Sequence, residues 1–111
     1  MPGSPGQFSS AVVWRDTVYL AGMIPHDWDA DIVGQAREVF SHIDTALEQA
    51  GTTRARLLSL TVYLRSFADY DGFRTAYEQW LERDALPARA TVRAELRDPR
   101  IRIEIMAIAA L

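Results

Sequence analysis

The residue best suited to chemistry in this sequence is Arg89, which lies in the run 86–90 two residues after Pro87. The pattern around it predicts a strand that begins near this arginine. An arginine side chain stays charged at working pH and offers a planar fork of N–H donors. At the rim of a sheet, such a fork is suited to holding a small carboxylate through two charge-assisted hydrogen bonds. The first chemical hypothesis is therefore a pocket for a carboxylated small molecule.

A second group of residues could be drawn as an oxygen-rich metal site: His26, Asp27, Asp29 and Asp31. Their spacing lacks the glycine and the distant glutamate that a calcium loop requires. Turn and helix-capping roles explain these residues better. His42 follows Glu38 by one helical turn and is predicted to be a solvated helix position. The sequence therefore predicts no metal ligands.

The composition excludes several further classes of protein. The chain has 111 residues, of which 49% are hydrophobic and 24% charged, as expected for one globular domain with a real core. The net charge of −3 argues against a nucleic-acid binder. The absence of cysteine excludes thiolate nucleophiles, disulfides and cysteine-bound metals. All twelve basic residues are arginine, so no lysine can form a Schiff base.

Neither end of the chain predicts targeting to a membrane. The first residues have no positive n-region and no apolar h-region, and no apolar run approaches the length of a membrane span. We therefore expect a soluble cytoplasmic protein. Residues 1–7 are rich in proline, glycine and serine and are predicted to be a flexible segment, and residues 8–111 are predicted to form a single domain.

The hydrophobic spacing predicts seven elements that must position these residues. Short strands are expected at 8–14 and 17–22, and a helix is expected from Ile32, capped by Asp29 or Asp31 and ended by Gly51. A strand at 57–64 precedes a second helix that begins near Asp69. The runs 86–96 and 101–109 each predict one further strand. The predicted order is β-β-α-β-α-β-β.

Alternation along the strands predicts which side chains share a face. One face should be apolar and pack on the helices, with Leu58, Leu60, Val62 and Leu64 of one strand, Ala90, Val92, Ala94 and Leu96 of another, and alternate residues of 101–109. The opposite face should carry Ser59, Thr61, Tyr63, Thr91, Arg93, Glu95, Arg102, Glu104 and Met106. That face is either solvated or covered by further copies of the chain, and the pattern leaves both open.

Two amphipathic helices need one apolar sheet face on which to bury their stripes. The predicted fold class is therefore α+β: a two-layer ferredoxin-like sandwich with a mixed β-sheet and two helices on one face.

Several segments resemble one known family in both order and spacing. They are 20–25 (LAGMIP), 35–37 (QAR), Ala50-Gly51, 60–64 (LTVYL), Tyr77, 87–89 (PAR) and 103–109 (IEIMAIA). In this combination they are similar to the Rid family, the RidA/YjgF-type reactive-intermediate deaminases. The resemblance runs from about Gly6 to the C-terminus, so it covers nearly the whole predicted domain.

The resemblance implies an assembly and an activity. Family members form homotrimers of chorismate-mutase-like protomers around a central barrel, with ligand pockets between subunits. Typical members hydrolyse short-lived enamines and imines, such as those of 2-aminoacrylate, to the 2-keto acid and ammonia, without a metal or an organic cofactor. The implied ligand is a small carboxylated imine or enamine, and neither a nucleic acid nor a membrane is implied as a partner.

The resemblance also implies site residues. Arg89 stands where the family places the arginine that holds the substrate carboxylate, and Gly22 where a backbone group lines the same pocket. Five other implied pocket positions depart from the better-known deaminases: Phe8 (often tyrosine), Ala21 (often serine), Arg74 (near a usual asparagine), Thr91 (often cysteine) and Met106 (at a site assigned to a glutamate). Glu104 shares a strand face with Met106, but the sequence does not show whether it reaches the site.

Three functions fit this sequence. The first is hydrolytic deamination of a 2-imino acid held by Arg89. The second is a specialised enzyme or accessory protein of secondary metabolism on the same scaffold, suggested by the apolar residues Phe8, Ala21 and Met106. The third is a non-catalytic binder of carboxylated metabolites.

Overall fold

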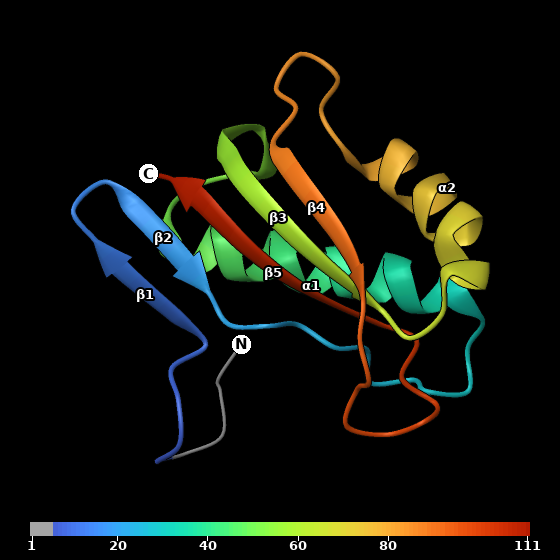
Figure 1. Cartoon of the computed structure of the whole chain (residues 1–111). Helices are drawn as coiled ribbons and strands as arrows, with labels where there is room; N and C mark the ends of the chain where they lie inside the picture. Colours follow the sequence, from blue (N-terminus) through green and yellow to red (C-terminus); the bar gives the residue numbers. More distant parts are fainter. Residues whose placement is uncertain (1–5) are drawn as a thin grey trace.

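The computed structural model describes residues 6–111 as a five-stranded sheet with two helices on one of its faces (Figure 1). The strands lie in the order β1-β2-β5-β3-β4, where only β3 and β4 are parallel. The elements are β1 (Ala11–Trp14), β2 (Thr17–Leu20), α1 (Ile32–Ala50), β3 (Leu57–Leu64), α2 (Tyr70–Trp80), β4 (Ala88–Arg93) and β5 (Ile103–Ala110), with short 3-10 turns at Arg54–Arg56 and Phe67–Asp69. The predicted two-layer α+β fold is confirmed.

The ends of α1 follow from local capping. The Asp31 carboxylate accepts a hydrogen bond of 2.8 Å from the Gly34 N–H, so Asp31 and not Asp29 is the N-cap. At the other end Gly51 adopts the left-handed conformation, with φ of 88°, which glycine takes at no steric cost.

None of the helices in the described part of the chain is long and apolar enough to span a bilayer.

The core lies between the helices and the sheet. α1 contributes Phe40 and Ile43, and α2 contributes Phe73 and Trp80, all of them buried. The Phe40 and Trp80 rings stack with centroids 4.4 Å apart. This aromatic contact joins the two helices, and their shared apolar stripe packs on the buried residues of β2, β3 and β5.

One prediction on β3 is wrong. The pairing with β5 shifts its register between Leu57 and Ser59, which marks a bulge. The bulge turns Leu57 into the core and leaves Leu58 49% exposed, whereas Leu60, Val62 and Leu64 are buried as predicted. An extra residue in a strand reverses the alternation on one side of it, and the hydrophobic pattern alone does not reveal it.

The predicted faces of β4 are also wrong. β4 pairs in parallel with β3, and Arg89, Thr91 and Arg93 lie beside Leu60, Val62 and Leu64. Partners in a parallel ladder project to the same face, so the polar residues of β4 face the helix layer. Its alanines and Val92 face the open side. β4 is an edge strand, so its apolar residues cover the open face instead of the core.

The N-terminal region differs slightly from prediction. β1 begins at Ala11 and not at Phe8, and β2 ends at Leu20. Of the segment predicted to be flexible, residues 1–5 lie outside the described residues. Gly6 and Gln7 form a turn that leads to Phe8, whose side chain is exposed.

Gln35 of α1 joins two loops through its buried side-chain amide. Its Nε2 donates to the carbonyl oxygens of Trp28, Ala30 and Arg100 over 2.9–3.2 Å, and its Oε1 accepts from the Arg102 N–H over 2.8 Å. The first two partners lie in the β2–α1 loop, and the others lie before β5. Since the side chain is fully buried, these backbone groups depend on it for their hydrogen bonds.

We expect Gln35→Ala to lower the free energy of unfolding by about 2–4 kcal/mol, because several backbone groups lose their partner at a buried site. Urea denaturation followed by circular dichroism measures this change. The matched control is Gln79→Ala, which removes an exposed amide on α2 bonded only to Arg37 and should cost less than about 1 kcal/mol. Equal costs for the two variants would contradict the role given to Gln35.

Candidate functional site

β4 and α2 together position Arg89. The parallel register beside Leu60 turns its side chain toward the helix layer, at the sheet edge where β4 has no outer neighbour. α2 presents a stripe of three aromatic residues at positions 70, 73 and 77, spaced three and four residues apart on one helix face. The guanidinium therefore lies over the aromatic face of α2.

The guanidinium of Arg89 is held by these rings. Its central carbon lies 5.0 Å from the ring centroid of Tyr77, 5.3 Å from that of Phe73 and 5.9 Å from that of Tyr70. Its Nη2 donates a hydrogen bond of 3.0 Å to the Tyr70 hydroxyl. Aromatic faces attract a cation without neutralising it. Among residues 6–111, no carboxylate forms an ion pair with Arg89, so its charge remains available to a ligand.

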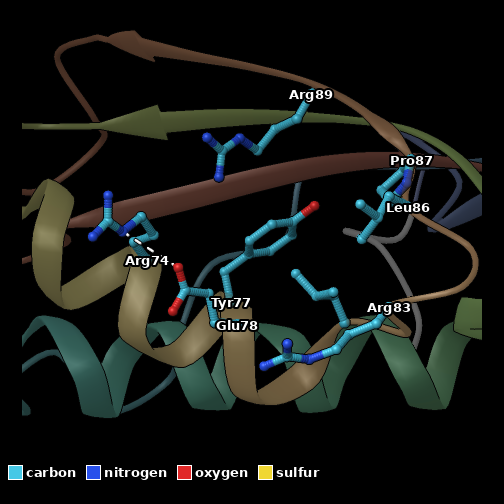
Figure 2. A pocket seen from close by; sticks show the side chains of 8 residues that line it. Arg74, Tyr77, Glu78, Arg83, Leu86, Pro87 and Arg89 are labelled. Atoms are coloured by element: carbon cyan, nitrogen blue, oxygen red, sulfur yellow. Dashed lines mark ion pairs between the residues drawn. The ribbon is translucent and has the colours of Figure 1, made fainter.

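A cavity of about 790 Å³ opens beside Arg89 (Figure 2). Its walls come from α2 and the segment that leads to β4: Arg74, Tyr77, Glu78, Leu81, Arg83, Leu86, Pro87 and Arg89. Arg74 forms an ion pair of 3.4 Å with Glu78, which Figure 2 marks. Three arginines against one glutamate give this cavity a net positive charge.

Tyr77 lies between the core and this cavity. Burial raises the pKa of its hydroxyl, and the nearby positive charge of Arg89 opposes that shift in part. The hydroxyl is therefore protonated throughout the neutral range and can donate a hydrogen bond to an anion. The arrangement suits a small organic acid.

A second, smaller hollow of about 320 Å³ lies near the ends of β3 and β5. Gly22, Tyr63, Glu104, Met106 and residues 94–97 line it. Burial raises the pKa of the Glu104 carboxyl, while the positive charge of Arg97 acts in the opposite direction. A partly buried acid with a raised pKa is a candidate for proton transfer.

Gly22 is required for this position of Glu104. A Cβ atom built on Gly22 would collide with the Glu104 carboxylate, so a larger residue would push the acid out of the hollow. Glu104 itself pairs with Tyr63 across the sheet, on the open face, whereas its neighbours Ile103 and Ile105 are buried. The predicted shared face of Glu104 and Met106 is confirmed.

The two cavities share no lining residue, and Arg89 and Glu104 project from opposite faces of the sheet. Within one chain, the structure brings Arg74 to Arg89, and it brings Gly22 to Met106 and Glu104. Thr91 lies on the same strand face as Arg89, and its buried Oγ1 has no hydrogen-bond partner. A single chain therefore holds two separate hollows, one beside Arg89 and one beside Glu104.

The remaining expected pocket residues lie outside both cavities. Ala21 precedes Gly22, where its N–H donates to the carbonyl oxygen of Ser10, but it lines neither hollow. Phe8 is 56% exposed and also lines neither. The apolar wall expected from Phe8, Ala21 and Met106 is not assembled within one chain.

Three residues that shape the surroundings of Arg89 and the second hollow were not assigned to a site from the sequence: Tyr70, Tyr77 and Glu104. Tyr70 and Tyr77 belong to the aromatic stripe of α2, and their helical spacing with Phe73 was the available signal. Glu104 was left undecided, although its alternation with Met106 already placed it on the right face. That burial raises its pKa could not be foreseen, because burial depends on the loop 94–97.

A third cluster of polar residues lies away from both hollows. The His42 side chain is only 19% exposed, and its Nε2 lies 2.7 Å from Oε2 of Glu38. The prediction of a solvated position for His42 is therefore wrong, because the β2–α1 loop covers this turn of α1.

Comparisons with known proteins match the whole chain. The family model described as endoribonuclease L-PSP matches residues 1–111. A RutC family protein from Haemophilus ducreyi is 34% identical over 105 residues, which cover 95% of this chain and 90% of that protein. The RutC family protein YoaB from Escherichia coli is 30% identical, with 95% and 91% of the two chains covered.

Solved structures of related proteins have the same fold as this chain. A YjgF-family protein from Neisseria meningitidis superimposes with a TM-score of 0.93 at 31% identity and covers 98% of this chain and 91% of that one. A Rid-family protein from Yersinia pestis, YyfA, gives a TM-score of 0.90 at 28% identity, with 99% and 92% of the two chains covered. The chain belongs to the Rid/YjgF family.

Proposed function

We propose that this protein hydrolyses the imine or enamine of a small carboxylic acid to the corresponding 2-keto acid and ammonia. The observation that carries the proposal is Arg89, a charged guanidinium without a carboxylate partner in residues 6–111, held beside a cavity of about 790 Å³. Membership of the Rid/YjgF family supports the reaction class. The alternatives are a specialised enzyme on the same scaffold and a non-catalytic metabolite binder, and the Arg89→Ala experiment below separates the binder from the deaminase.

Arg89 would hold the substrate carboxylate through two hydrogen bonds. Its aromatic support fixes the direction of the guanidinium, so little freedom is lost when the substrate binds. Arg74 and Arg83 add positive charge to the same cavity, which favours anionic substrates over neutral ones. This charge pattern supports an organic acid as ligand and gives no preference to apolar imines.

The hydrolysis itself needs one proton donor and one water. The imine nitrogen takes up a proton, a water oxygen bonds to the imine carbon, and the water gives up a proton to form a carbinolamine. The amino nitrogen of the carbinolamine then takes up a second proton, the C–N bond breaks and ammonia leaves, while the hydroxyl gives up its proton and its oxygen remains as the ketone oxygen. A Glu104 carboxyl with a raised pKa is suited to donate the first proton and to accept one from the water.

Arg89 and Glu104 can meet only if two chains cooperate, because they project from opposite sheet faces in one chain. The open face carries half-exposed apolar side chains, among them Tyr19, Val92 and Met106 at 39–43% exposure. We propose that these faces pack together in a homotrimer around a central barrel, with Arg89 of one protomer beside Gly22 and Glu104 of the next. In a cyclic trimer the same interface occurs three times, so three identical sites would form between neighbouring protomers.

The endoribonuclease description of the family model is a weaker basis for a function. The chain has a net charge of −3, whereas a protein that binds RNA through its phosphates carries a basic excess. Nothing in the two cavities favours a polynucleotide over a small acid.

We expect Arg89→Ala to lower kcat/KM by about 10²–10³-fold, because it removes charge-assisted hydrogen bonds to the carboxylate. An amino-acid oxidase releases the 2-imino acid in situ, and a semicarbazide trap measures the imine that survives. Arg93→Ala, on the same face of the same strand but outside the cavity, is the matched control and should retain activity. No acceleration by the wild-type protein with any amino-acid-derived imine, together with saturable binding lost in Arg89→Ala, would favour the non-catalytic binder.

We expect Glu104→Gln to lower kcat by about 10²-fold or more, because an amide cannot exchange a proton with substrate or water. Stability gives an independent readout. The raised pKa means that the folded protein holds this proton more tightly than the unfolded chain, so the wild type loses stability as pH rises through the folded pKa. The glutamine variant lacks this loss and should gain stability relative to wild type from acidic to neutral pH, as measured by urea denaturation. A variant that is less stable at neutral pH than at acidic pH, in parallel with wild type, would contradict the assignment.

The intersubunit site predicts complementation between two inactive variants. Light scattering should give about three times the protomer mass of 12.5 kDa. Arg89→Ala and Glu104→Gln protomers, unfolded together and refolded as a mixture, should regain activity, because some interfaces then combine an intact Arg89 with an intact Glu104. Mixing without refolding is the control. A monomer at all concentrations, or a mixture as inactive as its parts, would overturn the shared site.

A further inference from the structure

The only two histidines of the chain, His26 and His42, lie side by side although they are far apart in the sequence. Their ring centroids are 4.5 Å apart. Glu38 lies between them, with its Oε2 atom 2.7 Å from Nε2 of His42 and 3.8 Å from Nδ1 of His26. The ligand atoms of all three residues lie within 4.8 Å of one another.

We propose that His26, Glu38 and His42 form a binding site for a divalent transition-metal ion, with Zn²⁺ as the fitting example. Imidazole nitrogen together with one carboxylate oxygen is a donor set that zinc, nickel and copper prefer, whereas magnesium and calcium prefer oxygen alone. The site lies apart from the hollows beside Arg89 and Glu104, and it does not depend on the proposed deaminase function.

The distances fit this use. Ligand atoms about 2.0–2.2 Å from a tetrahedral zinc ion lie about 3.3 Å from each other. The two separations from Glu38 Oε2, 2.7 and 3.8 Å, bracket that value, and all ligand atoms lie within 4.8 Å of one another, so side-chain rotations can bring them around one ion. The His26 side chain is 73% exposed and free to make the larger rotation, whereas His42 at 19% is already held in place. A water molecule would complete the coordination.

Two backbone N–H groups orient the Glu38 carboxylate. The Glu38 carboxylate accepts hydrogen bonds from the backbone N–H groups of His26 and Asp27, the second over 3.0 Å. Outer hydrogen bonds of this kind orient a ligating carboxylate and strengthen metal binding. They also fasten the β2–α1 loop to α1, so a bound ion would add a further connection between the two segments.

Titration calorimetry of the untagged full chain with Zn²⁺ tests the proposal, since a histidine tag would bind the ion itself. We expect one ion per protomer and an affinity that falls at least tenfold in His26→Ala and in His42→Ala, because each removes one of three protein ligands. Glu48→Gln, an exposed acid on the same helix outside the cluster, is the matched control and should bind as wild type does. Mg²⁺ should produce no binding heat.

A second readout separates metal binding from a folding defect. The chain has two imidazole spin systems, so both should shift in an NMR spectrum when Zn²⁺ is added to the wild-type protein. Circular dichroism checks that the variants are folded. Zn²⁺ should raise the melting temperature of wild type but not of a double variant that carries both His26→Ala and His42→Ala. Zinc binding that persists unchanged in the double histidine variant, or imidazole signals that do not move in wild type, would overturn the site.

Discussion

The parallel pairing of β4 with β3 is the constraint on which the functional arrangement depends. It aligns Arg89 with Leu60 and thereby turns a charged side chain toward the helix layer at an unpaired sheet edge. A shift of this register by one residue would send the guanidinium to the open face and away from α2. The crossover through α2 both makes the parallel pairing possible and supplies the aromatic surface beneath the guanidinium.

The aromatic support explains how a charge can be fixed without being neutralised. A carboxylate partner would hold Arg89 equally well, but it would compete with an anionic ligand for the same donors. The rings of Phe73 and Tyr77 supply attraction and shape while leaving N–H groups free. The environment of Glu104 acts against its charged form, because partial burial raises the pKa of its carboxyl more than the positive charge of Arg97 lowers it. One sheet thus carries a guanidinium without an ion pair in residues 6–111 on one face and a carboxyl with a raised pKa on the other.

Much of the fold could be predicted from the sequence, because hydrophobic periodicity and caps are local. Ile32, Asp31 and Gly51 set the bounds of α1, and the alternating core residues of β5 were identified correctly. The wrong predictions concern side-chain faces on β3 and β4, where the pairing between strands, and not the hydrophobic alternation along one strand, decides which side chains are buried. Leu58 is exposed by a bulge, and Thr91 faces the helices because an edge strand takes its orientation from its neighbour. Arg89 was found through its type and context, but its aromatic support and the burial of Glu104 depend on contacts between distant segments.

Gln35 makes the two loops that it joins a single cooperative unit. One side chain holds the carbonyl oxygens of Trp28 and Arg100 and the N–H of Arg102, so both loops depend on the same buried amide for hydrogen bonds. A change at this one side chain would therefore reach two segments that are far apart in the sequence. A core residue of α1 thus anchors the backbone that runs from residues 94–97 of the Glu104 hollow into β5.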